Sequence, residues 1–184
     1  MLPIKKAHLL MAILSMGILF ISCDVKDKLD VDPLVGEYVI SEAKLTSALS
    51  VGQISLPEDY VITTYIRLAL YSSSPCELET NLRIQLAAGI IKTSGDVNYV
   101  CEGEDLSEDH GTWIVNSSRT DLDFLLNLDI SPLPVPFKLE GLSETSNSFT
   151  GNVTDLPVPT SLFDEEADPT DITTISFSVT FTKV

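Results

Sequence analysis

The stretch ISFSVTFT, residues 175–182, decides the fold of this chain. Apolar and hydroxyl-bearing side chains alternate along it without interruption. This period of two is typical of a β-strand that buries one face and exposes the other. The stretch therefore predicts a strand of an antiparallel sheet, with Ile175, Phe177, Val179 and Phe181 pointing into the core.

The same alternation recurs along most of the chain, between short clusters of glycine, serine, asparagine and charged residues. Further strands are expected within residues 34–45, 82–86, 97–101, 111–115, 120–129, 137–142 and 149–153. Strands joined in sequence order by short turns form an antiparallel up-and-down meander, and closure into a barrel removes the exposed edges. We therefore predict a mostly β fold, a barrel of about eight strands with one short helix.

Residues 60–71 break this alternation. Val61, Tyr65 and Leu68 recur at helical spacing, and PED, residues 57–59, places a proline and two acids where the first turn of a helix favours them. The β-branched residues of the segment keep a strand as the alternative. We predict a helix here. Loops are expected where serine, glycine, proline or acidic residues gather, in residues 46–56, 102–110, 131–136 and 156–171.

The first 22 residues have the order of a secretory signal, because Lys5 and Lys6 precede an apolar run over residues 9–21. A membrane-spanning helix needs about 20 apolar residues, so this run is too short to stay in a bilayer. We expect residues 1–22 to be removed on export.

The apolar run ends in FISC, residues 20–23, which resembles the lipobox of bacterial lipoproteins. The resemblance implies that Cys23 receives a diacylglyceryl thioether and becomes the new N-terminus; a free cysteine behind an uncleaved anchor is the alternative. Two or more acyl chains hold a protein firmly at a membrane. We expect a lipid-anchored protein of the bacterial cell envelope, at the outer membrane, and leave open which face of that membrane it occupies.

Residues 24–33 alternate in charge and contain few apolar side chains, which predicts a flexible tether that follows the lipidated Cys23. The remaining residues, 34–184, are enough for a single domain with its own core. The chain carries 27 acidic against 11 basic residues and a formal charge of −16. Such a polyanion repels phosphate backbones, so we expect no nucleic-acid partner.

Three cysteines are present, and lipid on Cys23 leaves Cys76 and Cys101 as a pair. Because an exported protein folds in an oxidising compartment, we expect a disulfide between these two. The loop-closure model gives such a bridge about 3.5 kcal/mol of stabilisation.

Candidate catalytic and metal-binding residues are few. His110 is the one histidine outside the signal, and no G-x-S-x-G elbow accompanies it, so we interpret it as a loop residue next to a strand. The acids of residues 164–171 lack the spacing of a calcium loop, and we interpret them as solvated, with cation binding left open. Trp113 is expected in the core, with stacking on a sugar or lipid as the alternative. We expect no catalytic residue, no metal and no cofactor.

Several short motifs along the chain resemble, in their order and spacing, those of a known protein family. They are GEY at 36–38, the pair Cys76 and Cys101, GTW at 111–113, TG at 150–151 and the closing VTFTKV at 179–184. Together with the lipobox they resemble the small lipocalin-like domain lipoproteins of bacteria. The resemblance implies a lipocalin-like barrel without enzymatic activity that binds a small apolar ligand or another envelope component. Two positions depart from the family pattern: Tyr38 stands where tryptophan is usual, and Lys183, not an arginine, is the late cation.

Two other functions stay open. A structural or adhesive surface protein would pair its last strand, residues 175–181, with a partner by strand addition. A hydrolase would need two carboxylates about 5 to 9 Å apart across a sugar. A closed barrel with an apolar cavity of about 300 Å³ or more would favour ligand binding over both. The identity of the ligand or protein partner and the oligomeric state stay open as well.

Replacement of Cys23 by alanine is expected to abolish the incorporation of labelled palmitate and to release the protein from the membrane fraction, because the acyl chains are the expected anchor. The wild-type chain, labelled and fractionated in parallel, is the reference. Unchanged labelling and fractionation of the Cys23→Ala variant would contradict the anchor.

Overall fold

The computed structural model describes residues 31–71, 81–84, 94–100, 110–127, 133–168 and 170–184. All of them belong to one compact unit, Val31–Val184. The expected signal, the lipidated Cys23 and the tether up to residue 30 lie outside the described residues, as do Cys76 and Cys101. The processing, the anchor and the disulfide therefore stay predictions.

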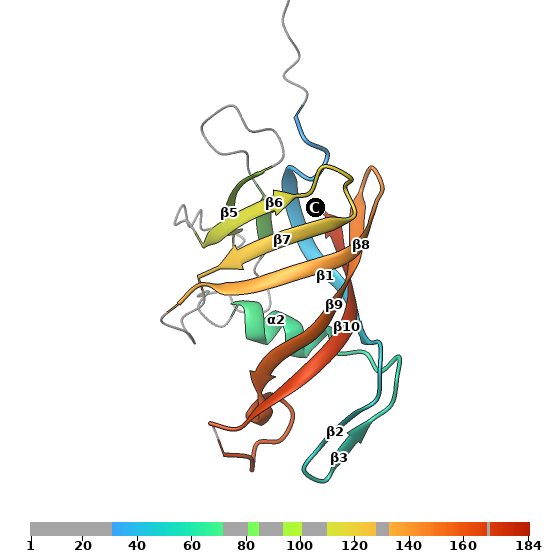
Figure 1. Cartoon of the computed structure of the whole chain (residues 1–184), viewed down its shortest axis with the longest axis vertical. Coiled ribbons are helices and arrows are strands. Elements are labelled where there is room, and N and C mark those ends of the chain that lie inside the picture. Colours follow the sequence, from blue (N-terminus) through green and yellow to red (C-terminus); the bar gives the residue numbers. More distant parts are fainter. Residues whose placement is uncertain (1–30, 72–80, 85–93, 101–109, 128–132, 169) are drawn as a thin grey trace, which may run out of the picture. The chain divides into compact units, whose positions relative to one another are not determined.

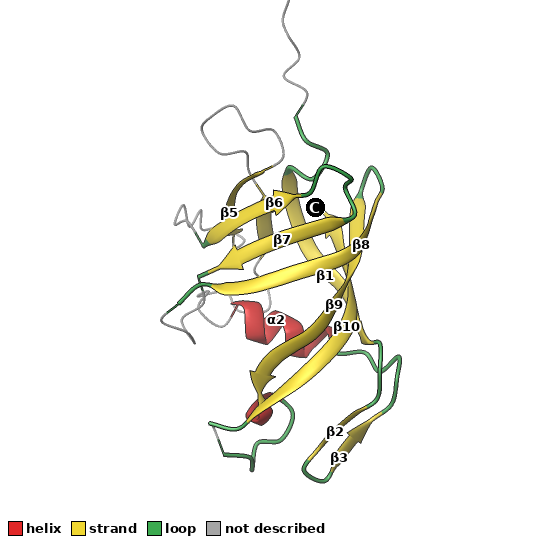
Figure 2. Ribbon diagram, in the orientation of Figure 1, coloured by secondary structure: helices red, strands yellow, loops and turns green. Residues whose placement is uncertain are grey.

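Eight antiparallel strands form a closed barrel in the order β1-β10-β9-β8-β7-β6-β5-β4 (Figures 1 and 2). The strands are β1 (Gly36–Leu45), β4 (Asn81–Ile84), β5 (Ser94–Val100), β6 (Gly111–Val115), β7 (Asp121–Leu126), β8 (Val135–Glu144), β9 (Ser148–Pro159) and β10 (Ile172–Lys183). From β4 to β10 each strand pairs with the next one in sequence, and β1 closes the barrel between β10 and β4. The predicted meander and its closure are confirmed.

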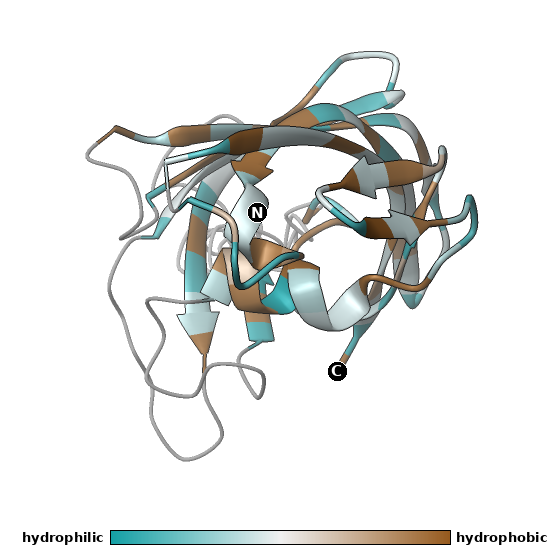
Figure 3. Ribbon diagram, turned by 90° about the horizontal axis from the view of Figure 1, so that it is seen from below, coloured by the Kyte–Doolittle hydropathy of each residue, from teal (hydrophilic) through white to brown (hydrophobic). Residues whose placement is uncertain are grey.

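Side chains from all eight strands fill the barrel. Ile175, Phe177, Val179 and Phe181 are buried, as the opening alternation predicted. The ring of Phe181 stacks on Phe149 of β9 with their centroids 4.7 Å apart. Figure 3 shows the alternation as brown and teal bands along the strands. The core is a packed apolar interior that lies between the strands.

The chain between β1 and β4 contains a hairpin that was expected to be a loop. Its strands are β2 (Leu49–Val51) and β3 (Ile54–Leu56), and they form a separate two-stranded sheet. Gly52 makes the turn at a φ of 56°, a conformation that glycine adopts without steric cost. The expected loop over residues 46–56 was wrong because Leu49 and Val51 gain burial on one face of the hairpin.

The predicted helix is present as α2 (Thr63–Tyr71), but it begins three residues later than expected. The preceding residues instead run along the end of β1, where the Leu45 N–H donates to the Tyr60 carbonyl at 3.0 Å and the Ile62 N–H to the Ala43 carbonyl at 2.8 Å. Backbone pairing with a strand thus outweighed the helix-start signal of residues 57–59. Among the described residues no helix has the length and apolar character that would let it cross a membrane.

Prolines also proved compatible with strands. Strand β8 begins at Val135 and includes Pro136, which lies opposite Leu125 of β7. Strand β9 extends through Pro157 and Pro159, both paired with β10, and a short 3-10 helix, η3 (Thr160–Leu162), follows. The loops expected over 131–136 and 156–171 are therefore shorter than predicted, because proline is tolerated where a strand lacks a second neighbour.

One end of the barrel is held closed by a three-residue ionic cluster. Arg119, in the turn between β6 and β7, donates to both oxygens of Asp32 at 2.7 and 3.1 Å and to both oxygens of Glu144 at 2.9 and 2.6 Å. The Asp32 side chain is only 3% exposed and also accepts the Leu34 N–H at 2.8 Å. These bonds raise the pKa of Arg119, chiefly through Asp32 and then Glu144. The cluster ties the segment before β1 to the turn between β6 and β7 and to the end of β8.

Tyr38 and Lys183, the two departures from the family pattern, meet at this same end. The Lys183 ammonium lies 5.6 Å from the centroid of the Tyr38 ring and donates to the Val35 carbonyl at 3.0 Å. A cation over an aromatic face is attracted by the ring electrons. Burial raises the pKa of Tyr38 to about 12, with Glu144 and Asp32 adding to the effect. Lys183 and Tyr38 therefore contact each other at this end of the barrel.

The variant Arg119→Ala is expected to lower the free energy of unfolding by about 2–4 kcal/mol, because it leaves the buried Asp32 carboxylate without its charged partner. Lys44→Ala is the control, since the Lys44–Glu42 pair is exposed and should contribute less than about 1 kcal/mol. Urea unfolding followed by circular dichroism measures both. Equal effects of the two substitutions would contradict a special role for the cluster.

Candidate functional site

The wall of the barrel is open along part of one strand boundary. Strand β8 pairs with β7 from Val135 to Glu140, yet it pairs with β9 only from Glu140 onward, where Glu140 faces Asn152. From Val153 on, the pairing of β9 is with β10 alone. We call the unpaired stretch between residues 135–139 and 153–159 the β8–β9 seam.

An apolar cavity of about 310 Å³ lies on the inner side of the seam, where α2 crosses the end of the barrel. We call it the mouth pocket. Its lining is apolar throughout and consists of Ala69, Leu70, Leu126, Val135, Phe137, Leu156, Pro157, Val158, Pro159 and Ile172. The volume falls at the lower end of the range of about 300–1,000 Å³ that is usual for ligand sites. The cavity meets the size that was expected of a ligand-binding barrel.

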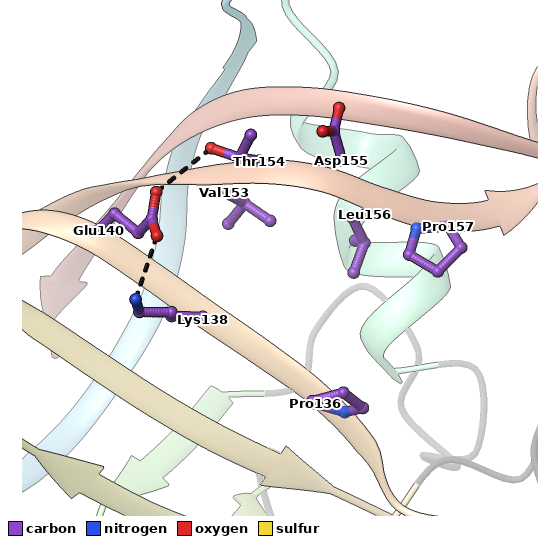
Figure 4. Close-up of a pocket in the computed structure, with 8 residues that line it drawn as sticks. All are labelled: Pro136, Lys138, Glu140, Val153, Thr154, Asp155, Leu156 and Pro157. Carbon is purple, nitrogen blue, oxygen red and sulfur yellow. Dashed lines mark hydrogen bonds and ion pairs between the residues drawn. The ribbon is translucent and has the colours of Figure 1, made fainter.

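A second hollow of about 280 Å³, which we call the outer groove, lies on the outer side of the same seam (Figure 4). It is lined by Pro136, Lys138, Glu140, Val153, Thr154, Asp155, Leu156 and Pro157. The Lys138 ammonium lies 3.1 Å from a Glu140 oxygen, and the Thr154 hydroxyl donates to the other Glu140 oxygen at 3.5 Å. Leu156 and Pro157 line both hollows, so the outer groove and the mouth pocket adjoin.

His110 has a structural role next to a strand, as predicted. Its ring stacks on Tyr99 at a centroid distance of 4.3 Å, and its Nδ1 accepts the Tyr99 N–H at 3.3 Å. Its backbone continues the sheet, because it donates to Val97 and accepts from Asn127 at 2.8 Å each. Trp113 on β6 is buried in the core, as predicted, and is not among the residues that line either hollow.

The acidic residues after β9 stabilise their own turns. Asp164 accepts the Glu166 N–H at 3.1 Å, and Asp168 accepts both the N–H and the hydroxyl of Thr170. These bonds lower the pKa of Asp168. Within the described part of the chain, no cluster of three or more histidine, cysteine, aspartate or glutamate side chains is placed to hold a metal ion.

Strand addition requires a free strand edge, and glycoside hydrolysis requires two free carboxyl groups. The last strand, β10, is paired with β9 along most of its length and with β1 from Phe177 onward, so residues 177–181 offer no free edge for strand addition. Asp32 and Glu144 do converge, but both are bound by the guanidinium of Arg119. That pair therefore lacks the free acid and base that glycoside hydrolysis uses.

Two buried tyrosines carry hydroxyls that no described residue satisfies. The rings of Tyr71, at the end of α2, and Tyr99, on β5, meet edge to face with centroids 5.2 Å apart. Neither hydroxyl has a hydrogen-bond partner in the described part of the chain, and the same is true of the Nε atom of Arg67. Burial raises the pKa of both tyrosines well above its ordinary value. Their rings contribute to packing, whereas their hydroxyls contribute none of the stability that a hydrogen bond would give.

The mouth pocket and the seam could not be located from the sequence pattern. The sequence did contain one signal, the prolines at positions 136, 157 and 159, which mark strand edges without a second partner. Those prolines were interpreted as loop residues. Comparison of the chain with protein-family models, with curated proteins and with solved structures finds no match. The geometry of the site therefore carries the functional argument.

The variant Tyr71→Phe is expected to leave the free energy of unfolding unchanged or to raise it by about 1–2 kcal/mol, because it removes a buried hydroxyl that lacks a partner. Tyr38→Phe is the control, since the Tyr38 hydroxyl donates to the Pro33 carbonyl at 3.3 Å and its loss should be mildly destabilising. Thermal unfolding of both variants distinguishes the two cases. A clear loss of stability in Tyr71→Phe would show that its hydroxyl is satisfied in solution.

Proposed function

We propose that the protein is a lipid-anchored, non-enzymatic barrel of the bacterial envelope that binds a small apolar ligand in the mouth pocket. The observation that carries the proposal is the lining of that pocket. Ten apolar residues from α2 and from the four strands β7, β8, β9 and β10 surround about 310 Å³ of space, and none of them carries a charge. Sites for small molecules are typically concave and apolar in this way.

The affinity that such a pocket supports is moderate. Burial of apolar surface contributes about 25 cal/mol per Å², so a ligand that buries about 300 Å² gains about 7 kcal/mol. This free energy corresponds to a dissociation constant on the order of 10 μM, and the cost of immobilising the ligand weakens it further. The site is therefore suited to a carrier or sensor that exchanges its ligand.

The lipocalin-like family assignment is part of the same proposal. It is supported by the closed eight-stranded antiparallel barrel. Localisation at the outer membrane rests on the lipobox-like FISC, residues 20–23. The chain carries 27 acidic against 11 basic residues, and a net charge far from zero favours solubility.

Ligand binding is tested by placing a charge at the rim of the pocket. The protein is exported from Asp24 onward behind a cleavable signal, which retains the whole compact unit Val31–Val184. Ile172 lines the pocket and is 62% exposed, so Ile172→Glu adds a charge there without disturbing the core. Ile114, 51% exposed on the outer face of β6, provides the matched control Ile114→Glu.

The fluorescent apolar amine N-phenylnaphthylamine is expected to bind the wild type and Ile114→Glu equally and to bind Ile172→Glu about tenfold more weakly, because a carboxylate next to an apolar ligand must lose water. Native mass spectrometry of the protein purified from its own host should detect a bound small molecule. Equal binding by all three proteins, together with ligand-free mass spectra, would contradict the proposed function.

A further inference from the structure

We propose that the ligand is an uncharged single-chain amphiphile that enters through the β8–β9 seam, with its tail in the mouth pocket and its hydrogen-bonding head in the outer groove. This inference rests on the proposed function and adds the chemistry of the ligand and the route by which it reaches the pocket. It follows from the position of the two hollows, from the composition of the seam and from the charges around it.

The two hollows form one path through the wall of the barrel. Leu156 and Pro157 belong to the lining of both, and β8 and β9 share no ladder hydrogen bonds alongside them. Figure 4 shows β8 and β9 diverging from Glu140 toward Pro136, with Leu156 and Pro157 on the β9 side of the opening and α2 behind it. A chain that lies across Leu156 would therefore have one end inside the barrel and the other end outside.

The seam is unsuited to a partner strand, although two unpaired edges face each other across it. Strand addition requires backbone N–H donors, and Pro136 on one edge and Pro157 and Pro159 on the other supply none. Lys138 on β8 adds an exposed charged side chain, which also discourages pairing with another chain. A ligand that needs no ladder of hydrogen bonds is compatible with these edges.

The charges of the outer groove select an uncharged head. The ammonium of Lys138 lies 3.1 Å from Glu140 and 3.7 Å from Asp121, so its charge is already compensated. Asp155 adds a further carboxylate to the lining, and the whole chain carries a formal charge of −16. An anionic head would be repelled by these acids, whereas a cationic head would have to displace Lys138 from the carboxylates that it already contacts.

An uncharged head can still be recognised in the groove. Glu140 accepts hydrogen bonds, Lys138 donates them, and Thr154 can do either. The Glu140 side chain already bridges the two strands, through Lys138 on β8 and Thr154 on β9, at the point where their pairing begins. A hydroxyl or ester head placed next to this bridge can form hydrogen bonds with the donors and acceptors of Lys138, Glu140 and Thr154.

The head-group preference is tested with decanol, decanoate and decylamine, which share a ten-carbon chain and differ in charge at neutral pH. Displacement of N-phenylnaphthylamine from the wild-type protein should show decanol binding about tenfold more tightly than either ion. Equal or tighter binding of decanoate or decylamine overturns the assignment of an uncharged head.

The route is tested with Thr154→Trp, which fills the outer groove from an exposed position on β9. It should weaken decanol binding about tenfold and slow its association in stopped-flow mixing, because the head loses its site and the seam is obstructed. Thr112→Trp, at an exposed position on the outer face of β6, is the matched control and should bind as the wild type does.

The outcomes separate this inference from the function on which it rests. If Ile172→Glu weakens binding while Thr154→Trp behaves as the wild type in both affinity and rate, the ligand uses the mouth pocket alone, and the seam proposal is overturned. If neither the wild type nor the Thr112→Trp control binds any of the three amphiphiles or the fluorescent probe, the proposed function itself is wrong.

Discussion

The need to pair every strand edge is the constraint on which this structure depends. A sheet with one apolar face buries that face by curling, and closure removes the last two edges. Strand β1 achieves this closure: residues Gly36 to Tyr38 pair with β4, and the length from Tyr38 to Leu45 pairs with β10. The register shifts at Ser41, whose hydroxyl donates to the Thr180 carbonyl at 3.1 Å. This bulge bends β1 so that it can serve both neighbours.

The two ends of the barrel meet different demands. At one end the cluster of Arg119, Asp32 and Glu144 and the contact of Lys183 with Tyr38 hold the segment before β1 in place. At the other end the chain between β1 and β4 places α2 across the opening, and Ile66, Leu70 and Tyr71 are buried there. A single helix leaves part of that opening uncovered, and the mouth pocket occupies this space. Charged contacts therefore hold one end of the barrel, and apolar surface lines the pocket at the other.

At the β8–β9 seam two strands that are neighbours in the barrel diverge and depart from full pairing. Its edges contain prolines, which cannot donate and therefore lose nothing when they lack a partner. The same prolines prevent another chain from completing the sheet. The unpaired edges of the seam are therefore protected against aggregation, and the gap between them leads to the mouth pocket. A barrel with all boundaries paired would have no such opening, and the ligand that we propose would have to pass α2.

Alternation along the chain was enough to predict the strands of the barrel, the inward residues of β10 and the closed barrel, and the helical spacing within residues 60–71 predicted the helix. Both patterns depend only on residue order. They failed where pairing competes with local preference. Residues 57–59 look like a helix start but form the turn before the β1 contact, and the prolines of β8 and β9 look like loop residues but lie in strands. The ionic cluster, the seam and the mouth pocket were beyond prediction, since each joins residues from distant parts of the chain. Only the register of neighbouring strands brings Asp32 to Arg119, or Leu156 opposite α2, and local sequence does not contain that register.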